Sequence, residues 1–524
     1  MARKRIFNME GPCNPQKHYV IDVLRGLEKK ILKLVEEEKY FVIHAARQSG
    51  KTTLLQALAK KISDGGEYYA VLCSLEGLQW IADENIGIPA IINTIKSALT
   101  SFALPNASLF ADGVNLNSTR TALNDALTAY CRSLDKPLVV LFDEADCLVG
   151  DTMISFLRQL RIGYSNRNSG VPFVHSLALV GMRDIRDYRN DIRDPSDTLG
   201  SGSPFNIVGE PLTLKNFTKE EIASLYAQHT EDTGQVFQDD AIDIVWEQTQ
   251  GQPWLVNATA WIIVDELTAD APLTPVTAEI ASKAMQAMIL RRFPHFGSLM
   301  ERLKEDRVRR IIEPVIVGEL GAIKRKSLDY EFTKDLGLIR DDRGCVEPAN
   351  PIYGEVIIRI LSGDSQSDFD EMKEDYPIPR YLKGDAIDID VLLRDFQSFW
   401  RANGEIWEEK YDYKEAAPLL ILQAFLQRVV NGGGVVIREV GSGRGRTDLC
   451  VFYKDHKYPI ELKIRRDTDT YAKGVEQTAR YMDKFGCTEG WLVIFDQRKN
   501  PSWDERLFVN TETVDSKTVT VFGC

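Results

Sequence analysis

One short segment constrains the fold of this chain more than any other. Residues 41–54 read Phe-Val-Ile-His-Ala-Ala-Arg-Gln-Ser-Gly-Lys-Thr-Thr-Leu, an apolar run followed by a turn of small and polar residues and the start of a helical pattern. A buried strand that leads through a tight turn directly into a helix is typical of parallel sheets covered by helices. We therefore expect an α/β core around this segment.

The same turn carries the residue types that bind a triphosphate. Such a ligand needs backbone N–H groups, a helix N-terminus and one lysine over its outer oxygens. Gly50 lets the backbone approach, Lys51 supplies the charge and Thr52 can ligate Mg²⁺. Ala45 replaces the first glycine of the usual G-x-x-x-x-G-K-T pattern. The other expected nucleotide-binding residues of the turn are Ala46, Arg47, Gln48, Ser49 and Thr53.

A second apolar run completes this site. Residues 137–142 read Pro-Leu-Val-Val-Leu-Phe and end in the carboxylates of Asp143 and Glu144. Asp143 would hold Mg²⁺ and Glu144 would orient the attacking water. Either half alone could be a glycine-containing turn or a strand capped by exposed acids. The two halves in this order predict that the chain binds ATP with Mg²⁺.

Length and composition bound the rest of the chain. With 524 residues the chain is too long to fold around a single hydrophobic core, so we expect several domains. No apolar run approaches the roughly 18 residues that cross a bilayer, and no apolar stretch of a secretory signal follows the basic N-terminus. The cysteines stand singly, which argues against a zinc site and predicts reduced thiols in a cytoplasmic protein. Because the net charge is −13, contact with nucleic acid requires a local basic patch.

The order of the patterns predicts an α/β multidomain chain. Strands are expected at 40–45, 68–74, 138–142 and 176–181, and an amphipathic helix at 20–38. A helical region, a helical module ending in a hairpin, a polar acidic stretch at 362–370 and a final α/β domain follow. The expected parts are a lead-in and parallel-sheet core (1–211), a helical region (212–290), a winged-helix domain (291–363), a linker (364–395) and a C-terminal domain (396–524).

Residues 8–363 resemble a known group on these motifs. They look like the AAA-like P-loop ATPases of the signal-transduction class with numerous domains (STAND), in which a helical lid and a winged helix follow the P-loop unit. The resemblance implies that Arg183, after the fourth strand, senses the γ-phosphate. It also implies that Pro253, in the lid motif Gly-Gln-Pro, lies beside the adenine, and that the lead-in around His18 and Tyr19 approaches the base.

Arg183 and Pro253 can also be interpreted as structural residues without a role in nucleotide binding. Arg183 could form a surface ion pair with Asp184 or Asp187, and residues 251–253 could be a simple turn between two helices.

The C-terminal domain carries a second group of polar residues. Asp448 begins one strand of an expected hairpin, and Glu461 and Lys463 lie on the other, with 12 residues between the two acids. Since side chains alternate along a strand, Glu461 and Lys463 point to the same face. Two carboxylates that hold Mg²⁺ and a lysine that positions water suit phosphodiester cleavage.

This spacing resembles the PD-(D/E)XK nuclease superfamily over residues 396–524, with Thr447-Asp448 in place of Pro-Asp. The resemblance implies a restriction-endonuclease-like fold, an additional acid at Glu415 and a glutamine at Gln477 beside the site. A hairpin with a solvated charged face, or an intact fold that does not cut, are the alternatives. The basic residues that could contact a phosphate backbone, or simply solvate the hairpin, are Arg438, Arg444, Arg446, Lys454, Lys457, Lys463, Arg465 and Arg466.

Together these motifs predict an ATP-controlled nuclease. Its cofactors would be ATP and Mg²⁺, with Mn²⁺ as an alternative at the nuclease site. Its partner would be nucleic acid, DNA before RNA, and assembly into a homo-oligomer on ATP binding is compatible with the scheme. Such architectures resemble those of prokaryotic defence and mobile-element control. The rival is a STAND-type ATPase scaffold whose C-terminal domain binds nucleic acid or a partner without cutting.

Overall fold

The structure is a computed structural model, and it falls into two compact units. These are Met1–Ala284 with Asp335–Gly337, and Met285–Lys334 with Leu338–Cys524. None of the described helices is long and apolar enough to span a membrane. The structure describes residues 5–24, 26–181, 212–291, 293–317, 323–325, 327–342, 344–371, 381–410, 416–430, 434–439, 447–465, 469–496, 498 and 502–524.

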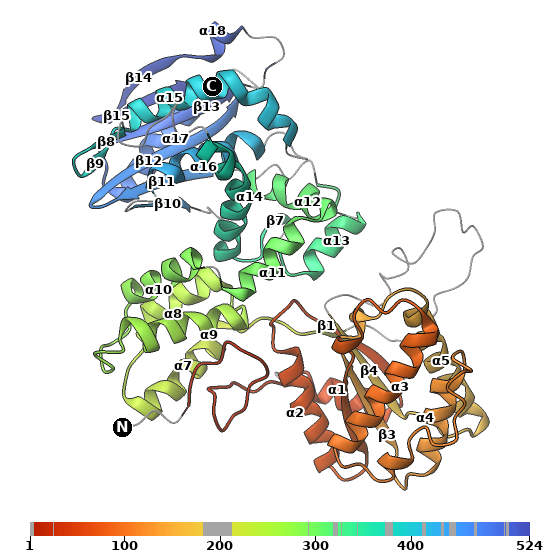
Figure 1. The fold of residues 1–524 in the computed structure, drawn as a ribbon. Helices are drawn as coiled ribbons and strands as arrows, with labels where there is room; N and C mark the ends of the chain where they lie inside the picture. The colour runs from red at the N-terminus through yellow and green to blue at the C-terminus, as the bar shows by residue number, and fades with distance from the viewer. Residues whose placement is uncertain are drawn as a thin grey trace. The chain divides into compact units, whose positions relative to one another are not determined.

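A five-stranded sheet in the order β2-β3-β4-β1-β5 forms the centre of the first unit (Figure 1). All neighbouring strands run parallel, which confirms the predicted parallel-sheet α/β core. The last strand, β5, consists of residues that the sequence had assigned to the helical region. The strands are β1 (Tyr40–His44), β2 (Tyr69–Ser74), β3 (Leu138–Asp143), β4 (Ser176–Gly181) and β5 (Leu212–Thr213).

Both faces of this sheet are buried, because successive apolar residues of each strand enter opposite cores. Tyr40 and Val42 of β1 pack with one set of helices, and Phe41 and Ile43 pack with the other. The helices α3, α4 and α5 cover the first face, and α1 and α2 cover the second (Figure 1). These helices are α1 (Glu28–Glu36), α2 (Lys51–Asp64), α3 (Glu84–Ser101), α4 (Ala122–Arg132) and α5 (Gly150–Asn166).

The helix α1 is shorter than the predicted helix at 20–38. Gly26 adopts a left-handed backbone conformation with φ 77°, which interrupts a right-handed helix. The Asp22 side chain also accepts the Leu24 N–H at 3.1 Å, a local turn that competes with helical hydrogen bonding.

A group of helices completes the first unit. The helix α7 begins with the predicted capping box, in which the Thr218 hydroxyl accepts the Glu221 N–H and the Glu221 carboxylate accepts the Thr218 N–H. The helix α10 extends past the unit boundary at 284. The helices are α7 (Lys219–Thr233), α8 (Asp239–Thr249), α9 (Pro253–Ile262) and α10 (Ala278–Leu290).

The second unit begins with helices and a two-stranded hairpin. Its helix α14 continues to Glu371, so the stretch 362–370 is helical where the sequence predicted a linker. The helix α14 packs against α16 of the C-terminal domain. The elements are α11 (Pro294–Leu303), α12 (Asp306–Val317), α13 (Leu328–Asp335), β6 (Ile339–Asp342), β7 (Cys345–Pro348) and α14 (Pro351–Glu371).

A mixed six-stranded sheet in the order β10-β11-β12-β13-β15-β14 forms the C-terminal domain. The strands β10, β11 and β12 pair antiparallel, whereas β12, β13 and β15 pair parallel, and the helix α17 lies between β12 and β13 in the chain. Two short strands, β8 (Leu382–Lys383) and β9 (Ala386–Ile387), precede it. The remaining elements are α15 (Ile389–Lys410), α16 (Ala416–Val430), β10 (Gly434–Glu439), β11 (Thr447–Tyr453), β12 (His456–Arg465), α17 (Thr470–Phe485), β13 (Glu489–Asp496), α18 (Trp503–Arg506), β14 (Val509–Val514) and β15 (Lys517–Gly523).

Candidate functional site

The turn between β1 and α2 is shaped by backbone conformations that few residues adopt. Gly50 has φ 92° and is the N-cap of α2, and Gln48 also has positive φ, at 56°. The Ser49 hydroxyl donates a hydrogen bond to the Ala46 carbonyl at 2.7 Å and closes the turn. The N-terminus of α2 therefore faces the turn with its free N–H groups, a ready position for an anion.

Lys51 is buried inside this turn, with 5% of its surface exposed. Its ammonium donates to the carbonyls of Ala45 and Ala46 at 3.1 and 3.2 Å. Burial lowers the pKa of Lys51, and the nearby carboxylates, Glu144 foremost, oppose that shift. A buried ammonium whose hydrogen bonds to the described residues go to neutral carbonyls is suited to an anionic ligand that replaces those carbonyls.

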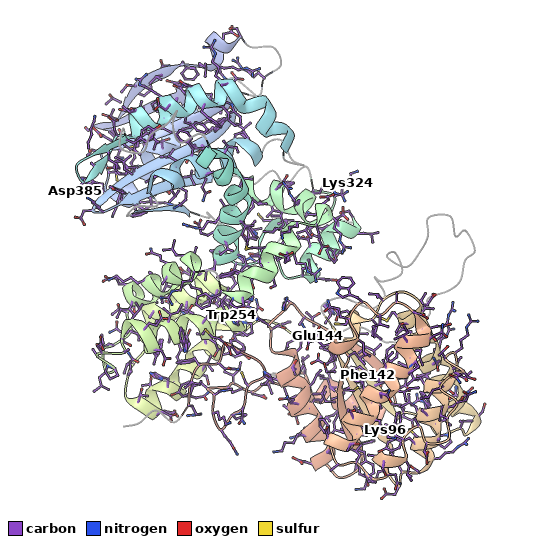
Figure 2. The ribbon with its side chains drawn as sticks, in the orientation of Figure 1. Lys96, Phe142, Glu144, Trp254, Lys324 and Asp385 are labelled. Atoms are coloured by element: carbon purple, nitrogen blue, oxygen red, sulfur yellow. The ribbon has the colours of Figure 1, made fainter. Side chains whose placement is uncertain are left out.

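The end of β3 brings two carboxylates to the same turn. The Thr52 hydroxyl donates to Asp143 Oδ2 at 2.7 Å, so the hydroxyl and carboxylate oxygens that Mg²⁺ prefers already lie together. Glu144 follows with φ 51°, a strained conformation for a non-glycine residue and one that concentrates at functional sites. Figure 2 labels Phe142 and Glu144 at this strand end. Burial raises the pKa of both Asp143 and Glu144.

A cavity of about 710 Å³ opens over these residues within the first unit. Its walls come from the turn and α2, from the lead-in before α1, and from the helical region, where Pro253 lines it. A cavity of this size is in the range of small-ligand sites. The turn residues that line it are Arg47, Gln48, Ser49, Gly50, Lys51, Thr52 and Thr53, together with Asp143 and Glu144.

Hydrogen bonds that the sequence motifs did not reveal join the lead-in, the segment before α1, to the start of α2 and to α9. The Cys13 N–H donates to the Thr53 hydroxyl at 3.0 Å, and the Trp254 indole N–H donates to the Met9 carbonyl at 3.0 Å. Trp254 lies on α9, directly after Pro253 (Figure 2). No spacing rule links Met9 to a residue so far along the chain, so only the folded structure identifies this contact.

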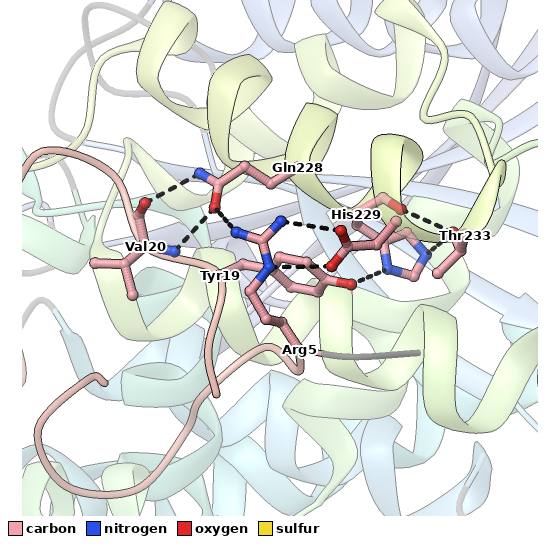
Figure 3. Close-up of polar contacts among 7 residues, drawn as sticks. Arg5, Tyr19, Val20, Gln228, His229 and Thr233 are labelled. Carbon is pink, nitrogen blue, oxygen red and sulfur yellow. Dashed lines mark hydrogen bonds and ion pairs between the residues drawn. The ribbon is translucent and has the colours of Figure 1, made fainter. Parts of the chain in front are cut away.

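A second set of polar contacts fixes the start of the lead-in to α7 (Figure 3). Arg5 donates to Asp232 through two nitrogens at 3.0 and 3.1 Å and to Gln228 at 3.0 Å. The Gln228 amide in turn donates to the Val20 carbonyl at 3.0 Å. Two hydrogen bonds between one guanidinium and one carboxylate fix the relative orientation of the two side chains as well as their distance.

The buried pair Tyr19 and His229 lies beside this ion pair. Each residue is 1% exposed, and the Tyr19 hydroxyl lies 3.2 Å from His229 Nδ1. We predict that Tyr19→Phe lowers the free energy of unfolding by about 1–3 kcal/mol, because the buried His229 ring loses its hydrogen bond with the Tyr19 hydroxyl. Urea denaturation measures this. Tyr164→Phe, which removes a hydroxyl without a hydrogen bond to a described residue, should change little; an equal loss in both variants would contradict the prediction.

Position 251, two residues before Pro253, favours glycine for two reasons: its backbone conformation and the closeness of a neighbouring carbonyl. Its φ is 69°, and an added Cβ would lie 1.9 Å from the Phe217 carbonyl oxygen. The Phe217 N–H also donates to the Gly251 carbonyl at 2.8 Å, which holds the two backbones together.

We therefore predict that Gly251→Ala destabilises the first unit by about 2–5 kcal/mol, from left-handed strain and overpacking. Thermal unfolding followed by circular dichroism measures the loss. Gly77→Ala is the matched control, because an added Cβ there meets nothing within 4 Å. A Gly251 variant as stable as the Gly77 variant would refute this reading of the turn.

In the C-terminal domain, the pairing of β11 with β12 sets Asp448 directly opposite Glu461. Glu461 is 1% exposed, and its Oε1 lies 2.5 Å from the Lys463 ammonium. Its Oε2 makes no hydrogen bond to a described residue. A buried carboxylate with an open oxygen is costly unless another group completes its partners. The described side chains include no cluster of three or more His, Cys, Asp or Glu residues suited to a metal.

The structure describes only some of the other residues that were predicted for the two sites. Gln477 lies on α17, half-buried, and its Oε1 has no hydrogen-bond partner among the described residues. Arg183 and Glu415 lie outside the described residues, as do Arg444, Arg446 and Arg466.

Comparisons with known proteins found one matching family and several similar structures. A family model described as AAA-like domain matches residues 11–273. No curated protein matches the chain. The Walker-type ATPase of Pyrococcus abyssi is 14% identical with a TM-score of 0.46, over 67% of this chain and 99% of that one. Cdc6p from Pyrobaculum aerophilum is 13% identical with a TM-score of 0.36, over 68% and 97%. The Drosophila ORC bound to DNA is 11% identical with a TM-score of 0.34, over 70% and 80%.

Proposed function

The chain belongs to the AAA-like domain family, and from this premise we propose that it is an ATP-hydrolysing switch that controls a metal-dependent nuclease in its C-terminal domain. The observation that carries the first half is the contact between Thr52 and Asp143 beside the buried Lys51. The observation that carries the second half is the pairing of Asp448 with the buried Glu461 and its neighbour Lys463.

In the proposed ATP site each residue has a separate task. The N–H groups at the start of α2 and the Lys51 ammonium bind the phosphates, the ammonium exchanging its loop carbonyls for phosphate oxygens. Thr52 and Asp143 hold Mg²⁺, which when bound neutralises phosphate charge. Glu144 accepts a hydrogen bond from the attacking water and orients it. Arg183 would stabilise charge on the γ-phosphate, and Pro253 would contact the adenine.

In the proposed nuclease site Asp448 and Glu461 supply the oxygen ligands of one or two Mg²⁺ or Mn²⁺ ions. A bound ion lowers the pKa of its water and stabilises charge on the scissile phosphate. Lys463 would position the attacking water, and Gln477 and Glu415 would support the site. The buried, open Glu461 Oε2 fits this reading because a bound cation would complete its partners.

The proposed control is a shift between two arrangements whose balance depends on the bound nucleotide. DNA is the proposed substrate, and a homo-oligomer on ATP binding is the proposed assembly. The proposed setting is prokaryotic defence or mobile-element control, in the cytoplasm. The second candidate is a STAND-type scaffold that binds nucleic acid without cutting. The contact of the Lys463 ammonium with Glu461 Oε1 favours that candidate, because it is also what a structural ion pair would show.

Cleavage of plasmid and single-stranded DNA with Mg²⁺ or Mn²⁺, with and without ATP, tests the proposal. We expect cutting by the native chain, its loss in Asp448→Ala, and a changed response to ATP in Lys51→Ala. ATP hydrolysis measured in the same samples shows whether turnover accompanies control. Intact ATP binding without cutting under any of these conditions would support the scaffold instead.

A further inference from the structure

Exposed apolar side chains gather at one end of the helical group α7–α10, where the turn after α7 meets the segment between α9 and α10. Val236, Leu267 and Leu273 are 48%, 44% and 67% exposed, and we call these three residues the apolar patch. The two segments lie side by side, because the Val276 N–H donates to the Val236 carbonyl at 2.8 Å. A Cβ added at Gly234 would lie 3.6 Å from the Leu273 side chain. Single exposed apolar residues are common, whereas a group of them is typical of an interaction surface.

A buried glutamine joins the two segments of the patch. Gln235 is 1% exposed, and its amide donates to the Thr268 hydroxyl and to the Thr274 carbonyl, both at 3.0 Å. Its side-chain oxygen lies 3.0 Å from His229 Nε2. These bonds fix the chain on both sides of Leu273. A surface that is already ordered in the free protein loses little conformational entropy when a partner binds.

The helix before the patch ends in an unusual backbone turn. Residues Ile263–Leu267 form a π-helix, in which the Thr268 N–H donates to the Ile263 carbonyl at 2.9 Å, five residues earlier in the chain. The Thr268 hydroxyl donates to the same carbonyl at 2.9 Å. Turns of this kind are rare and occur frequently at functional sites. Leu267 of the apolar patch belongs to this turn, which is a second, independent sign of a functional surface.

The charge of these helices indicates which kind of partner the patch binds. Residues 220–282 contain 12 aspartates and glutamates and no lysine or arginine. Such a surface repels the phosphate groups of nucleic acids and of anionic lipids, and it attracts lysine and arginine side chains. We call the exposed acids that border the patch in the chain the acidic rim; they are Asp239, Asp240, Asp265, Glu266 and Asp270.

We propose that the apolar patch and the acidic rim dock a cationic, amphipathic segment of a partner protein. Apolar side chains of that segment pack on Val236 and Leu273, and its lysines or arginines face the rim. The apolar contact supplies most of the affinity, and the charges steer association and select the partner. The inference depends neither on the proposed nuclease nor on ATP binding, because the residues of the patch and the rim are not among those that line the nucleotide cavity.

Selection from displayed peptides provides the probe. Each peptide has about 14 residues, roughly four helical turns, and each position is leucine, serine, lysine or glutamate. We expect selection on the full chain to enrich peptides that combine lysine with leucine and to deplete glutamate. Binding of one enriched synthetic peptide, measured by fluorescence anisotropy, should weaken as the salt concentration rises.

A substitution in the apolar patch tests the apolar half of the proposal. Leu273→Ser should weaken binding of the selected peptide about tenfold or more, because an apolar contact is lost. Leu109→Ser is the matched control, since Leu109 is 58% exposed elsewhere in the same unit, and it should keep the affinity. Thermal unfolding should be the same in both variants, because both side chains are exposed.

A double substitution in the acidic rim tests the charged half. Asp239→Asn/Asp270→Asn should weaken binding about 2- to 30-fold, as expected for two exposed charge pairs. The matched control is Asp151→Asn/Asp112→Asn, which should keep the affinity. It removes the same charge from one exposed acid in the first turn of a helix and one in a loop turn, as at positions 239 and 270.

Several results would overturn the proposal. These are a selection that enriches no peptides combining lysine with leucine, equal affinity of the two leucine variants, and equal affinity of the two aspartate variants. Binding of phosphatidylserine vesicles or duplex DNA that is lost in Leu273→Ser would assign the patch to a different ligand. A dimer of the full chain that dissociates in Leu273→Ser would assign it to a second copy, and would equally overturn the proposal.

Discussion

Replacing Lys51 by methionine should weaken ATP binding by roughly 30- to 4,000-fold, since truncating one partner of a buried charge contact costs about 2–5 kcal/mol. The same change should leave the nucleotide-free chain at least as stable as before. Lys51 is buried and its pKa is lowered, so its charge at neutral pH disfavours the folded state. Methionine keeps the length of the side chain and removes the charge.

The pH dependence gives this prediction a second readout. A lysine whose pKa is depressed on folding contributes stability above its ordinary value of 10.5 and loses it as the pH falls through the folded-state value. The stability advantage of Lys51→Met should therefore be largest at neutral pH and shrink as the pH rises toward that ordinary value. Isothermal titration calorimetry measures ATP affinity, and thermal denaturation over a pH series measures stability.

Lys60→Met is the matched control, because Lys60 lies on the same helix with its side chain exposed. It should change neither ATP affinity nor the pH profile. If the Lys51→Met chain binds ATP as tightly as the native chain, Lys51 does not bind the phosphates. A chain that loses affinity and also unfolds more easily would mean that Lys51 stabilises the fold.

The core around the nucleotide site could be predicted from short sequence motifs, because the residues that define each motif are close together in the chain. A strand, a tight turn and a helix start occupy one continuous segment, so Gly50 and Lys51 could be read directly from residue order. The capping box at Thr218 is a further example, since its two hydrogen bonds span three residues. Asp143 could be matched with Thr52 because parallel strands bring their carboxyl ends to one edge of the sheet.

Contacts between distant residues could not be predicted in this way. The bond from Trp254 to the Met9 carbonyl and the ion pair of Arg5 with Asp232 depend on where the lead-in lies in the folded unit. The polar stretch 362–370, which predicted a linker, lies within a helix, because composition alone does not distinguish a polar helix from a loop. The helix α14 also packs on α16, a tertiary contact that no local pattern in the sequence predicts.

The second large effect tests the nuclease site proposed for the C-terminal domain: if that proposal holds, Glu461→Gln should reduce DNA cleavage by about 10³-fold. A metal ligand contributes several kcal/mol of transition-state stabilisation, and the amide keeps the shape of the side chain while removing its charge. Glu461 is suited to this test because it is almost fully buried and contacts the Lys463 ammonium. Plasmid cleavage at increasing Mg²⁺ and Mn²⁺ concentrations gives both the rate and the metal requirement.

Glu489→Gln, the same substitution at an exposed position on the neighbouring strand β13, should leave cleavage unchanged. A merely structural role for Glu461 would lower stability, and the residual rate would keep the metal dependence of the native chain. A ligand role requires the opposite: a higher metal requirement in a chain that still folds and still binds ATP. Lys463→Met should then slow cleavage while the metal requirement stays the same, because the lysine acts on water and phosphate. If cleavage survives Glu461→Gln at native metal concentrations, the buried pair belongs to a domain that binds nucleic acid and does not cut it.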